Sequence, residues 1–162
     1  MRLSGDEYYL NIAKAVSRAS TCLSRQYGSI IVRYNNFRKR GRICSTGYNG
    51  NPSGMNNCSD ILDKCPRREK NIDHNTNNYI ESGCSSLHSE ANCVIQAGEE
   101  LCKGSVLYIY GFDLIENKEI ENPSPCPSCI GILMNAGIVK YVNNKGEFPI
   151  IRKMITNGGG CG

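Results

Sequence analysis

The sequence predicts a single α/β domain in which a mixed central sheet of about five strands lies between helices on both faces. Two observations lead to this fold class. Apolar residues recur with a helical period in some segments and form β-branched runs in others, in the order helix, strand, strand, helix, strand, helix, strand. The length of 162 residues suits one domain with one core. We expect this domain to span residues 1–155, followed by a flexible Gly-rich tail at 156–162.

The first third of the chain predicts one helix and an antiparallel hairpin. A helix is expected over Asp6–Ser20, capped by Ser4 or Asp6, because apolar side chains recur three and four residues apart. The β-branched run Gly28–Val32 predicts a buried strand, and Ile43–Tyr48 predicts its hairpin partner.

The later part of the chain predicts two helices that alternate with strands. Alternation of this kind implies parallel pairing of the strands, in contrast to the early antiparallel hairpin. Gly98 and Gly137 are expected to end the two helices. The expected helix, strand, polar connection, helix and strand are Leu87–Ala97, Val106–Tyr110, Phe112–Ser124, Cys126–Ala136 and Ile138–Val142.

Two segments lack a clear period. Gly47–Gly54 holds three glycines and one proline and is expected to be a loop. Residues 56–83 are polar and rich in Asn, and no element can be assigned to them from the sequence.

Composition excludes several classes of protein. No stretch is long and apolar enough to span a membrane, and no apolar signal region follows the first six residues, so we expect a cytoplasmic protein. Ten cysteines in such a chain indicate thiols and metal ligands more than disulfides. The net charge of +4 is mild, so no long nucleic acid is expected as a partner.

Two basic runs account for part of the positive charge. They are usually solvated faces, although phosphate binding is the more specific alternative. The runs are Arg38-Lys39-Arg40 with Arg42, and Arg67-Arg68 with Lys70.

A histidine, a glutamate and a cysteine pair carry the most informative motifs. The chain reads His88-Ser89-Glu90 and Pro125-Cys126-Pro127-Ser128-Cys129, each at the start of a predicted helix. Zinc prefers nitrogen and sulfur ligands, and a catalytic site keeps one of four positions for water, so His88, Cys126 and Cys129 can fill the other three. Helix N-termini favour thiolates, and cysteines three residues apart share a helix face. Glu90 can then carry protons without binding the metal.

Each motif alone has an ordinary interpretation. A single C-x-x-C is common in structural zinc sites and redox centres, and an isolated H-x-E is usually a surface pair. The two together are the pattern of zinc-dependent nucleobase deaminases. His74, the only other histidine, lies in the polar Asn-rich segment.

At these motifs the chain resembles the deoxycytidylate (dCMP) deaminases of the cytidine deaminase superfamily. Ser89 stands where Ala is more usual, and Tyr27 and Ser29 stand where Val and Ala are more usual. Members acting on free cytidine usually have Cys in place of His88, and those acting on transfer RNA usually lack the Gly-Tyr-Asn-Gly loop. The resemblance covers roughly Glu7–Val142 and includes Arg25-Gln26-Tyr27-Gly28-Ser29-Ile30-Ile31-Val32, Gly47-Tyr48-Asn49-Gly50-Asn51-Pro52-Ser53-Gly54 and Asn135-Ala136-Gly137-Ile138.

The resemblance implies a three-layer cytidine-deaminase-like fold and a catalytic Zn²⁺. It implies hydrolytic deamination of dCMP to dUMP and ammonia, which supplies dUMP for thymidylate synthesis. Glu90 is then the catalytic residue. The residues implied to contact the substrate are Arg25, Asn49, Ala91, Ser124 and Pro125.

The resemblance also implies regulation and assembly. In many members dCTP activates and dTTP inhibits, and these nucleotides bind near the Gly-rich loop in a hexamer. For this chain it implies a homo-oligomer and a regulatory nucleotide, accompanied by Mg²⁺, at Gly50, Asn51 and Gly54. The compartment implied is the cytosol of a cell or of a viral host.

Two of the implied substrate contacts also have structural interpretations. Arg25 directly precedes a predicted strand and can supply the cation that a nucleotide phosphate requires, although exposed arginines without a ligand are common. Asn49 offers a donor and an acceptor in a Gly-rich setting, although Asn-Gly often simply forms a turn.

The cysteines outside the motif divide into two groups. Four of them can close a second, structural zinc site, with His74 able to replace one of them, and some viral and bacterial members of the family have a second zinc near the equivalents of Cys22 and Cys58. The alternative is that single cysteines are small buried hydrophobes, as we expect for Cys44, Cys93 and Cys102. The four candidate ligands are Cys22, Cys58, Cys65 and Cys84, and Cys161 in the tail is expected to be a free thiol.

Three classes of function are consistent with the sequence. The leading hypothesis is a dCMP deaminase. The enzyme alternatives are deamination of another cytosine nucleotide or of adenosine in RNA. The non-enzyme alternative is a catalytically silent zinc protein in nucleic-acid uptake, against which Glu90 argues, because a purely structural zinc site needs no carboxylate there.

Overall fold

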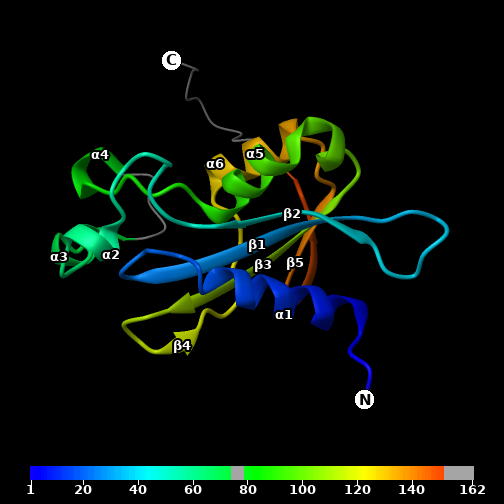
Figure 1. Ribbon diagram of the computed structural model, residues 1–162, viewed down its shortest axis with the longest axis horizontal. Coiled ribbons are helices and arrows are strands. Elements are labelled where there is room, and N and C mark those ends of the chain that lie inside the picture. Colours follow the sequence, from blue (N-terminus) through cyan, green and yellow to red (C-terminus); the bar gives the residue numbers. More distant parts are fainter. Residues whose placement is uncertain (74–78, 152–162) are drawn as a thin grey trace.

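The computed structural model describes residues 1–73 and 79–151, which form a twisted sheet with helices on both faces (Figure 1). The sheet has six strands, in the order β2-β1-β3-β5-β6 with β4 beside β3. The α/β class and the mixed sheet are therefore confirmed, and the expected number of about five strands is one too few. The strands are β1 (Arg25–Arg33), β2 (Arg42–Tyr48), β3 (Val106–Asp113), β4 (Lys118–Glu119), β5 (Lys140–Asn143) and β6 (Gly146–Pro149).

The pairing of the strands follows the expected division of the chain. β1 is antiparallel to both β2 and β3, so the early hairpin is confirmed. β3 and β5 are parallel, as the alternation of strand and helix predicted, and β6 returns antiparallel to β5. The sequence missed β4, which lies inside the expected polar connection, and it missed β6. Both strands are too short, at two and four residues, to show a clear pattern.

The helices form the two outer layers. In Figure 1, α1 (Gly5–Ser17) covers one face of the sheet, and α5 (Ser89–Cys102) and α6 (Pro127–Asn135) cover the other. The segment that could not be assigned from the sequence contains three short helices, which Figure 1 shows beyond one end of the sheet. These are α2 (Cys58–Ile61), α3 (Pro66–Glu69) and α4 (Tyr79–Ser82).

Two apolar cores lie on opposite faces of the sheet. Ile30 and Val32 of β1 pack with Tyr9 of α1, whereas Ile31 between them packs with Cys93 of α5 and Leu133 of α6. Successive side chains of a strand point to opposite faces, so an uninterrupted apolar run is what a strand covered on both sides requires.

The helix boundaries differ from the expected ones in detail. Ser4 caps α1 through a reciprocal capping box with Glu7, and α1 ends at Ser17, three residues before the expected end. Gly98 has a φ of 71° and breaks the helical geometry as expected, but helical residues resume and α5 continues to Cys102. α6 begins and ends within one residue of the expected bounds.

Some expectations lie outside the described residues. These are the flexible tail at 156–162, the free thiol of Cys161 and any ligand role of His74. Within residues 1–73 and 79–151, no helix has both the length and the apolar character needed to cross a membrane.

The backbone of α5 lies close to the sheet at Gly47 of β2. A Cβ atom at this position would lie 2.4 Å from the carbonyl oxygen of Ser89 and 2.6 Å from the amide nitrogen of Cys93. Both atoms belong to the backbone of α5, so they cannot move without shifting the helix. Gly47 therefore sets the depth at which the first turn of α5 packs.

We predict that Gly47→Ala destabilises the fold by about 1–3 kcal/mol, the usual cost of overpacking a core. The matched control is Gly5→Ala in the first turn of α1, where nothing lies within 4 Å of the added Cβ. Thermal unfolding of both variants measures the difference. Equal melting temperatures for the two variants would contradict the prediction.

Candidate active site

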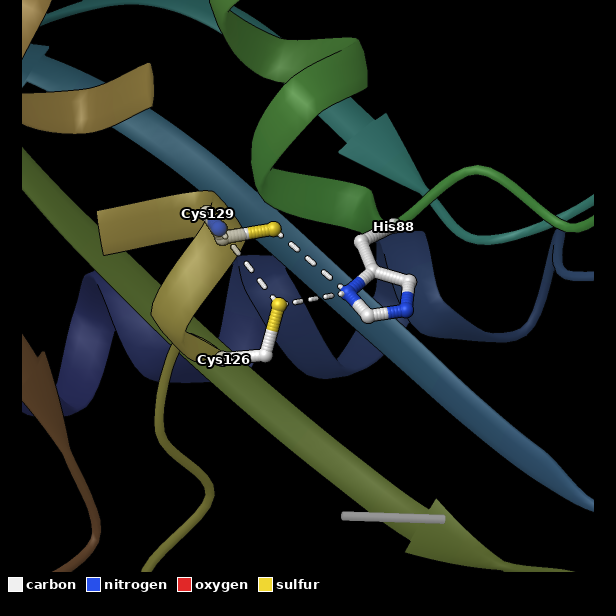
Figure 2. Close-up of side chains that lie close together, drawn as sticks. All are labelled: His88, Cys126 and Cys129. Atoms are coloured by element: carbon white, nitrogen blue, oxygen red, sulfur yellow. Dashed lines mark hydrogen bonds between the residues drawn. The ribbon is translucent and has the colours of Figure 1, made fainter. Parts of the chain in front are cut away.

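The starts of two helices meet at the zinc motifs. His88 is the N-cap of α5 and Cys126 is the N-cap of α6, while Cys129 lies in the first turn of α6. Figure 2 shows the three side chains pointing toward one another across the gap between these helices. Because His88 lies at the cap and not inside the helix, its direction is fixed by the preceding chain. Leu87 exchanges two backbone hydrogen bonds with Gly50, at 2.8 and 3.1 Å.

The three ligand atoms have the spacing of a zinc site. The Nδ1 atom of His88 lies 3.4 Å from the Sγ atom of Cys126 and 3.4 Å from that of Cys129. Tetrahedral zinc, with bonds of about 2.3 Å to sulfur and about 2.0 Å to nitrogen, would separate these atoms by about 3.5 Å. The donor set of one imidazole and two thiols leaves one tetrahedral position for water. The residues therefore fit a catalytic zinc.

The first turn of α6 favours a thiolate. A hydrogen bond with Cys129 is the largest influence on Cys126, and despite burial, further hydrogen bonds from the Cys129 amide and His88 help to lower the pKa of Cys126 to about 4. The hydrogen bond with Cys126 in turn raises the pKa of Cys129 and that of His88. These hydrogen bonds thus favour the thiolate form of Cys126, which is the form that binds a metal.

Glu90 lies beside the cluster, with only 4% of its surface exposed. Burial raises the pKa of Glu90, and the nearby His88 opposes this increase. One carboxylate oxygen, Oε2, accepts a 2.9 Å hydrogen bond from the hydroxyl of Ser89. A carboxyl group with an elevated pKa in a dry cavity can both accept and donate a proton near neutral pH.

The motif residues line a cavity of about 230 Å³. His88, Glu90 and Cys126 form part of its wall. Four of the five expected substrate contacts also line it, namely Arg25, Asn49, Ser124 and Pro125. Among the described residues, the fifth, Ala91, is half-buried in α5 and is not part of the wall.

The side chain of Asn49 uses most of its hydrogen-bonding positions for contacts within the protein. Its Oδ1 atom accepts hydrogen bonds from the Tyr27 amide at 2.8 Å and the Ser20 hydroxyl at 2.7 Å. Its Nδ2 atom donates to the carbonyl oxygen of Arg25 at 2.8 Å. An amide nitrogen carries two hydrogens, so one donor remains for a ligand in the cavity. Asn49 therefore both anchors the start of β1 and faces the cavity.

Arg25 is anchored at its base by Asp113 at the end of β3. Its Nε atom lies 3.1 Å from Asp113 Oδ2, and Arg68 of α3 binds the same oxygen at 2.7 Å. Burial opposes ionisation of Asp113, but hydrogen bonds from the Glu116 amide and the two arginines lower its pKa to about 2. The carboxylate thus stays charged and holds the Arg25 guanidinium at the edge of the cavity.

Sequence reasoning missed the position of Arg67. The sequence placed it in a basic run, with a solvated face as the usual interpretation and phosphate binding as the alternative, and the solvated face is wrong for Arg67. Arg67 is 4% exposed, donates a hydrogen bond to the carbonyl oxygen of Asp73 and lines the cavity with Arg25. No period exists in a four-residue helix, so the sequence carried no signal for this burial. Tyr27 and Ser86 also line the cavity.

The residues expected to bind a regulatory nucleotide are not part of the wall of this cavity, and two of them, Gly50 and Asn51, line a smaller cavity. Asn51 is held by the loop itself, since its Nδ2 atom donates to the carbonyl oxygen of Asn56 at 2.7 Å and its Oδ1 atom accepts from Ser85 at 3.0 Å. Gly54 has a φ of 89°, a conformation that favours glycine. Gly50 is tied to Leu87, one residue before the ligand His88.

The four cysteines expected to bind a structural zinc, Cys22, Cys58, Cys65 and Cys84, line one small cavity of about 20 Å³. Three of them, Cys22, Cys65 and Cys84, also line the larger cavity, whereas Cys58 does not. Burial raises the pKa of Cys22 and Cys58. Within the described residues, the close grouping of three ligand atoms inside 4.8 Å occurs at His88, Cys126 and Cys129 and not at these four.

Comparison with known protein families gives a match over most of the chain. The model of the cytidine and deoxycytidylate deaminase zinc-binding region matches residues 3–144. The chain belongs to this family. Because the match includes both zinc motifs and the Gly-rich loop, it covers every element that forms the cavity.

Several proteins similar to this chain are deoxycytidylate deaminases. The deoxycytidylate deaminase of Mycobacterium phage D29 is 30% identical over 142 residues, which cover 86% of this chain and 94% of that protein. The deoxycytidylate deaminase of Schizosaccharomyces pombe is also 30% identical over 142 residues, but these span only 37% of its length. A crystal structure of dCMP deaminase from cyanophage S-TIM5, in complex with dCMP and dUMP, has a TM-score of 0.56 and 26% identity over 88% of this chain and 82% of that one.

Proposed function

We propose that this protein is a dCMP deaminase, which converts dCMP and water into dUMP and ammonia and supplies dUMP for thymidylate synthesis. The observation that carries the proposal is the meeting of His88 Nδ1 and the sulfurs of Cys126 and Cys129 beside the buried carboxyl of Glu90. A structural zinc site has no use for this carboxyl. The relatives named above, and the neighbour solved with dCMP and dUMP, support the choice of substrate.

The chain's own residues divide the chemistry between them. Zinc bound by His88, Cys126 and Cys129 would supply a water molecule whose pKa is lowered to roughly 7. Glu90 accepts the proton of this water at a carboxylate oxygen and donates it to the ring nitrogen of cytosine. The oxygen of the water bonds to C4 of the cytosine ring, and Glu90 moves the second proton from this oxygen to the amino group, whose bond to C4 breaks as ammonia leaves. The burial of Glu90, of which only 4% is exposed, limits the access of bulk water to its carboxyl group.

We predict that Glu90→Gln retains zinc but loses at least about 100-fold in kcat, because the amide keeps the size of the side chain and cannot carry a proton. Ammonia release from dCMP measures turnover, and metal analysis measures zinc. The matched control is Glu99→Gln, an exposed glutamate of the same helix. Turnover of Glu90→Gln within tenfold of the parent would refute the role of Glu90.

Two arginines form the proposed phosphate site. Arg25 and Arg67 line the cavity from different elements, one at the start of β1 and one in α3. Asp113 engages Arg25 through Nε, so the terminal nitrogens of the guanidinium can bind a phosphate. Asn49, Ser124 and Pro125 complete the proposed contacts with the nucleotide. Ala91 does not line the cavity, so we propose no direct contact between Ala91 and the nucleotide.

Arg25→Ala is predicted to raise the KM for dCMP by roughly 10–150-fold, the range expected when one charged hydrogen bond of about 1.5–3 kcal/mol is lost. Deoxycytidine, which has no phosphate, should be deaminated as weakly as by the parent. Arg68→Ala is the control, because Arg68 binds the same Asp113 oxygen but does not line the cavity. An equal loss for both substrates would make Arg25 a structural residue.

A second zinc, held by four cysteines, is proposed at the smaller cavity. Cys22, Cys58, Cys65 and Cys84 come from separate segments and face one space. Zinc would replace their protons, draw the sulfurs together and tie a segment that is poor in core residues to the loop before β1.

Metal analysis should therefore give two zinc ions per chain for the parent and one for the Cys58→Ser/Cys65→Ser double variant. Each substitution removes a thiolate ligand, and structural zinc binding contributes to folding, so the melting temperature should fall as well. Cys44→Ser serves as the control, since Cys44 lies away from both cavities. One zinc per chain in both the parent and the double variant would refute the second site.

Regulation, assembly and compartment are further parts of the proposal. We place a dCTP activator and a dTTP inhibitor, with Mg²⁺, at Gly50, Asn51 and Gly54 in a homohexamer. The hydrogen bonds between Gly50 and Leu87 give this loop a direct link to His88. The nine described cysteines are free thiols, which supports the cytosol of a cell or viral host. Ammonia release with each nucleotide added, and light scattering for the mass, test these points.

A further inference from the structure

Two buried hydroxyl groups stand directly behind the carboxyl of Glu90. Ser29 lies in the middle of β1 and Ser89 is the first residue of α5, and both side chains are fully buried. Their Oγ atoms are 2.7 Å apart, and the Oγ atom of Ser89 lies 2.9 Å from Glu90 Oε2. The three groups form a continuous chain of hydrogen bonds from the sheet to the carboxylate.

The chemistry of the groups fixes the direction of this chain. In its ionised form, in which it accepts the proton of water, Glu90 can only accept hydrogen bonds, so the single hydroxyl hydrogen of Ser89 points to Glu90 Oε2. Ser89 then has no hydrogen left for Ser29, and Ser29 must donate to Ser89. The order is therefore Ser29 to Ser89 to Glu90. Ser29 can influence the carboxylate only through Ser89.

We propose that Ser29 and Ser89 are positioning residues for the deamination, a role that rests on the function proposed above. The chain of hydroxyls holds Oε2 against the sheet and so fixes the rotation of the carboxylate. The other oxygen, Oε1, then has a constant orientation for proton transfer. Because β1 is covered on both faces, Ser29 is a rigid base for this support.

Each of the two buried hydroxyls also serves as a hydrogen-bond partner for the other. A buried hydroxyl without a partner costs free energy, whereas exchanging both members of a pair for apolar groups can be nearly neutral. Alanine at only one of the two positions would leave the other hydroxyl short of a partner. Ser29 and Ser89 therefore depend on each other as one hydrogen-bonded pair.

The test compares four proteins: the parent, Ser29→Ala, Ser89→Ala and the double variant. We expect Ser89→Ala to lower kcat for dCMP about 10-fold, at the lower end of the range for groups that orient a reacting residue, with zinc content and dUMP affinity unchanged. Ser29→Ala should lower kcat less. Ser29→Ala should cause no further loss of kcat in the Ser89→Ala variant, because the hydroxyl of Ser89 that links Ser29 to Glu90 is already absent.

Thermal unfolding gives a readout that does not depend on activity. Each single variant should melt below the parent, and the double variant should lose less than the sum of the two single losses. Ser45→Ala is the matched control, since Ser45 donates a 2.9 Å hydrogen bond to the Cys93 carbonyl of the same helix and does not contact Glu90. It should lower the melting temperature and leave kcat near that of the parent.

Several outcomes would overturn the proposal. One is a kcat of Ser89→Ala within twofold of the parent. Another is a double variant whose loss of kcat equals the two single losses combined. A third is a loss of kcat in Ser45→Ala as large as that in Ser89→Ala. If kcat falls only because zinc or dUMP affinity falls, the serines are structural and not positioning residues. A parent that releases no ammonia from dCMP would instead refute the proposed function, and the positioning role with it.

Discussion

The site depends on two helix starts that are held against the same face of one sheet. His88 and Cys126 both precede the first helical residue of their helices, so the distance between them is set by how α5 and α6 pack and not by either helix alone. The parallel pair β3 and β5 requires a crossover, and α6 lies in that crossover on the face that α5 already covers. The tight contact at Gly47 then fixes the depth of α5. The geometry of the three ligand atoms is therefore set mostly by the sheet, through the pairing of β3 with β5 and the contact at Gly47.

The zinc motif and one proposed phosphate ligand, Arg67, lie in different parts of the chain. The zinc ligands and Glu90 belong to the regular layers. Arg67 belongs to α3, in the segment beyond the end of the sheet that has few core residues. In this segment Cys65 lines both the small cysteine cavity and the larger cavity, and Arg67, two residues later, lines the larger one. A metal at the cysteines would therefore hold a phosphate ligand in place without touching the reacting groups.

Sequence patterns predicted the features whose cause is local. The capped helix α1, the hairpin, β3, α6 and β5 follow from periodicity, and the zinc motifs follow from the spacing of a few reactive side chains. The ends of β1 could not be predicted, because its first residue is held by the distant Asn49 and Asp113. The same holds for β4 and β6, which exist only as partners of other strands. The burial of Arg67 is likewise decided by contacts outside its own short helix.

The polar groups around the cavity show how a buried site selects what it can bind. Asn49 uses three of its hydrogen-bonding positions to hold β1 and Ser20, and retains one N–H. Arg25 is tied by Nε to Asp113, and its terminal nitrogens extend beyond that contact. Glu90 is held at Oε2 by Ser89. Internal bonds thus satisfy much of each group, as burial requires, and the cavity wall still presents an amide, a guanidinium and a carboxyl group to a ligand. A ligand for this cavity must bring an acceptor, an anion and a basic ring nitrogen, and a cytosine nucleotide monophosphate brings all three.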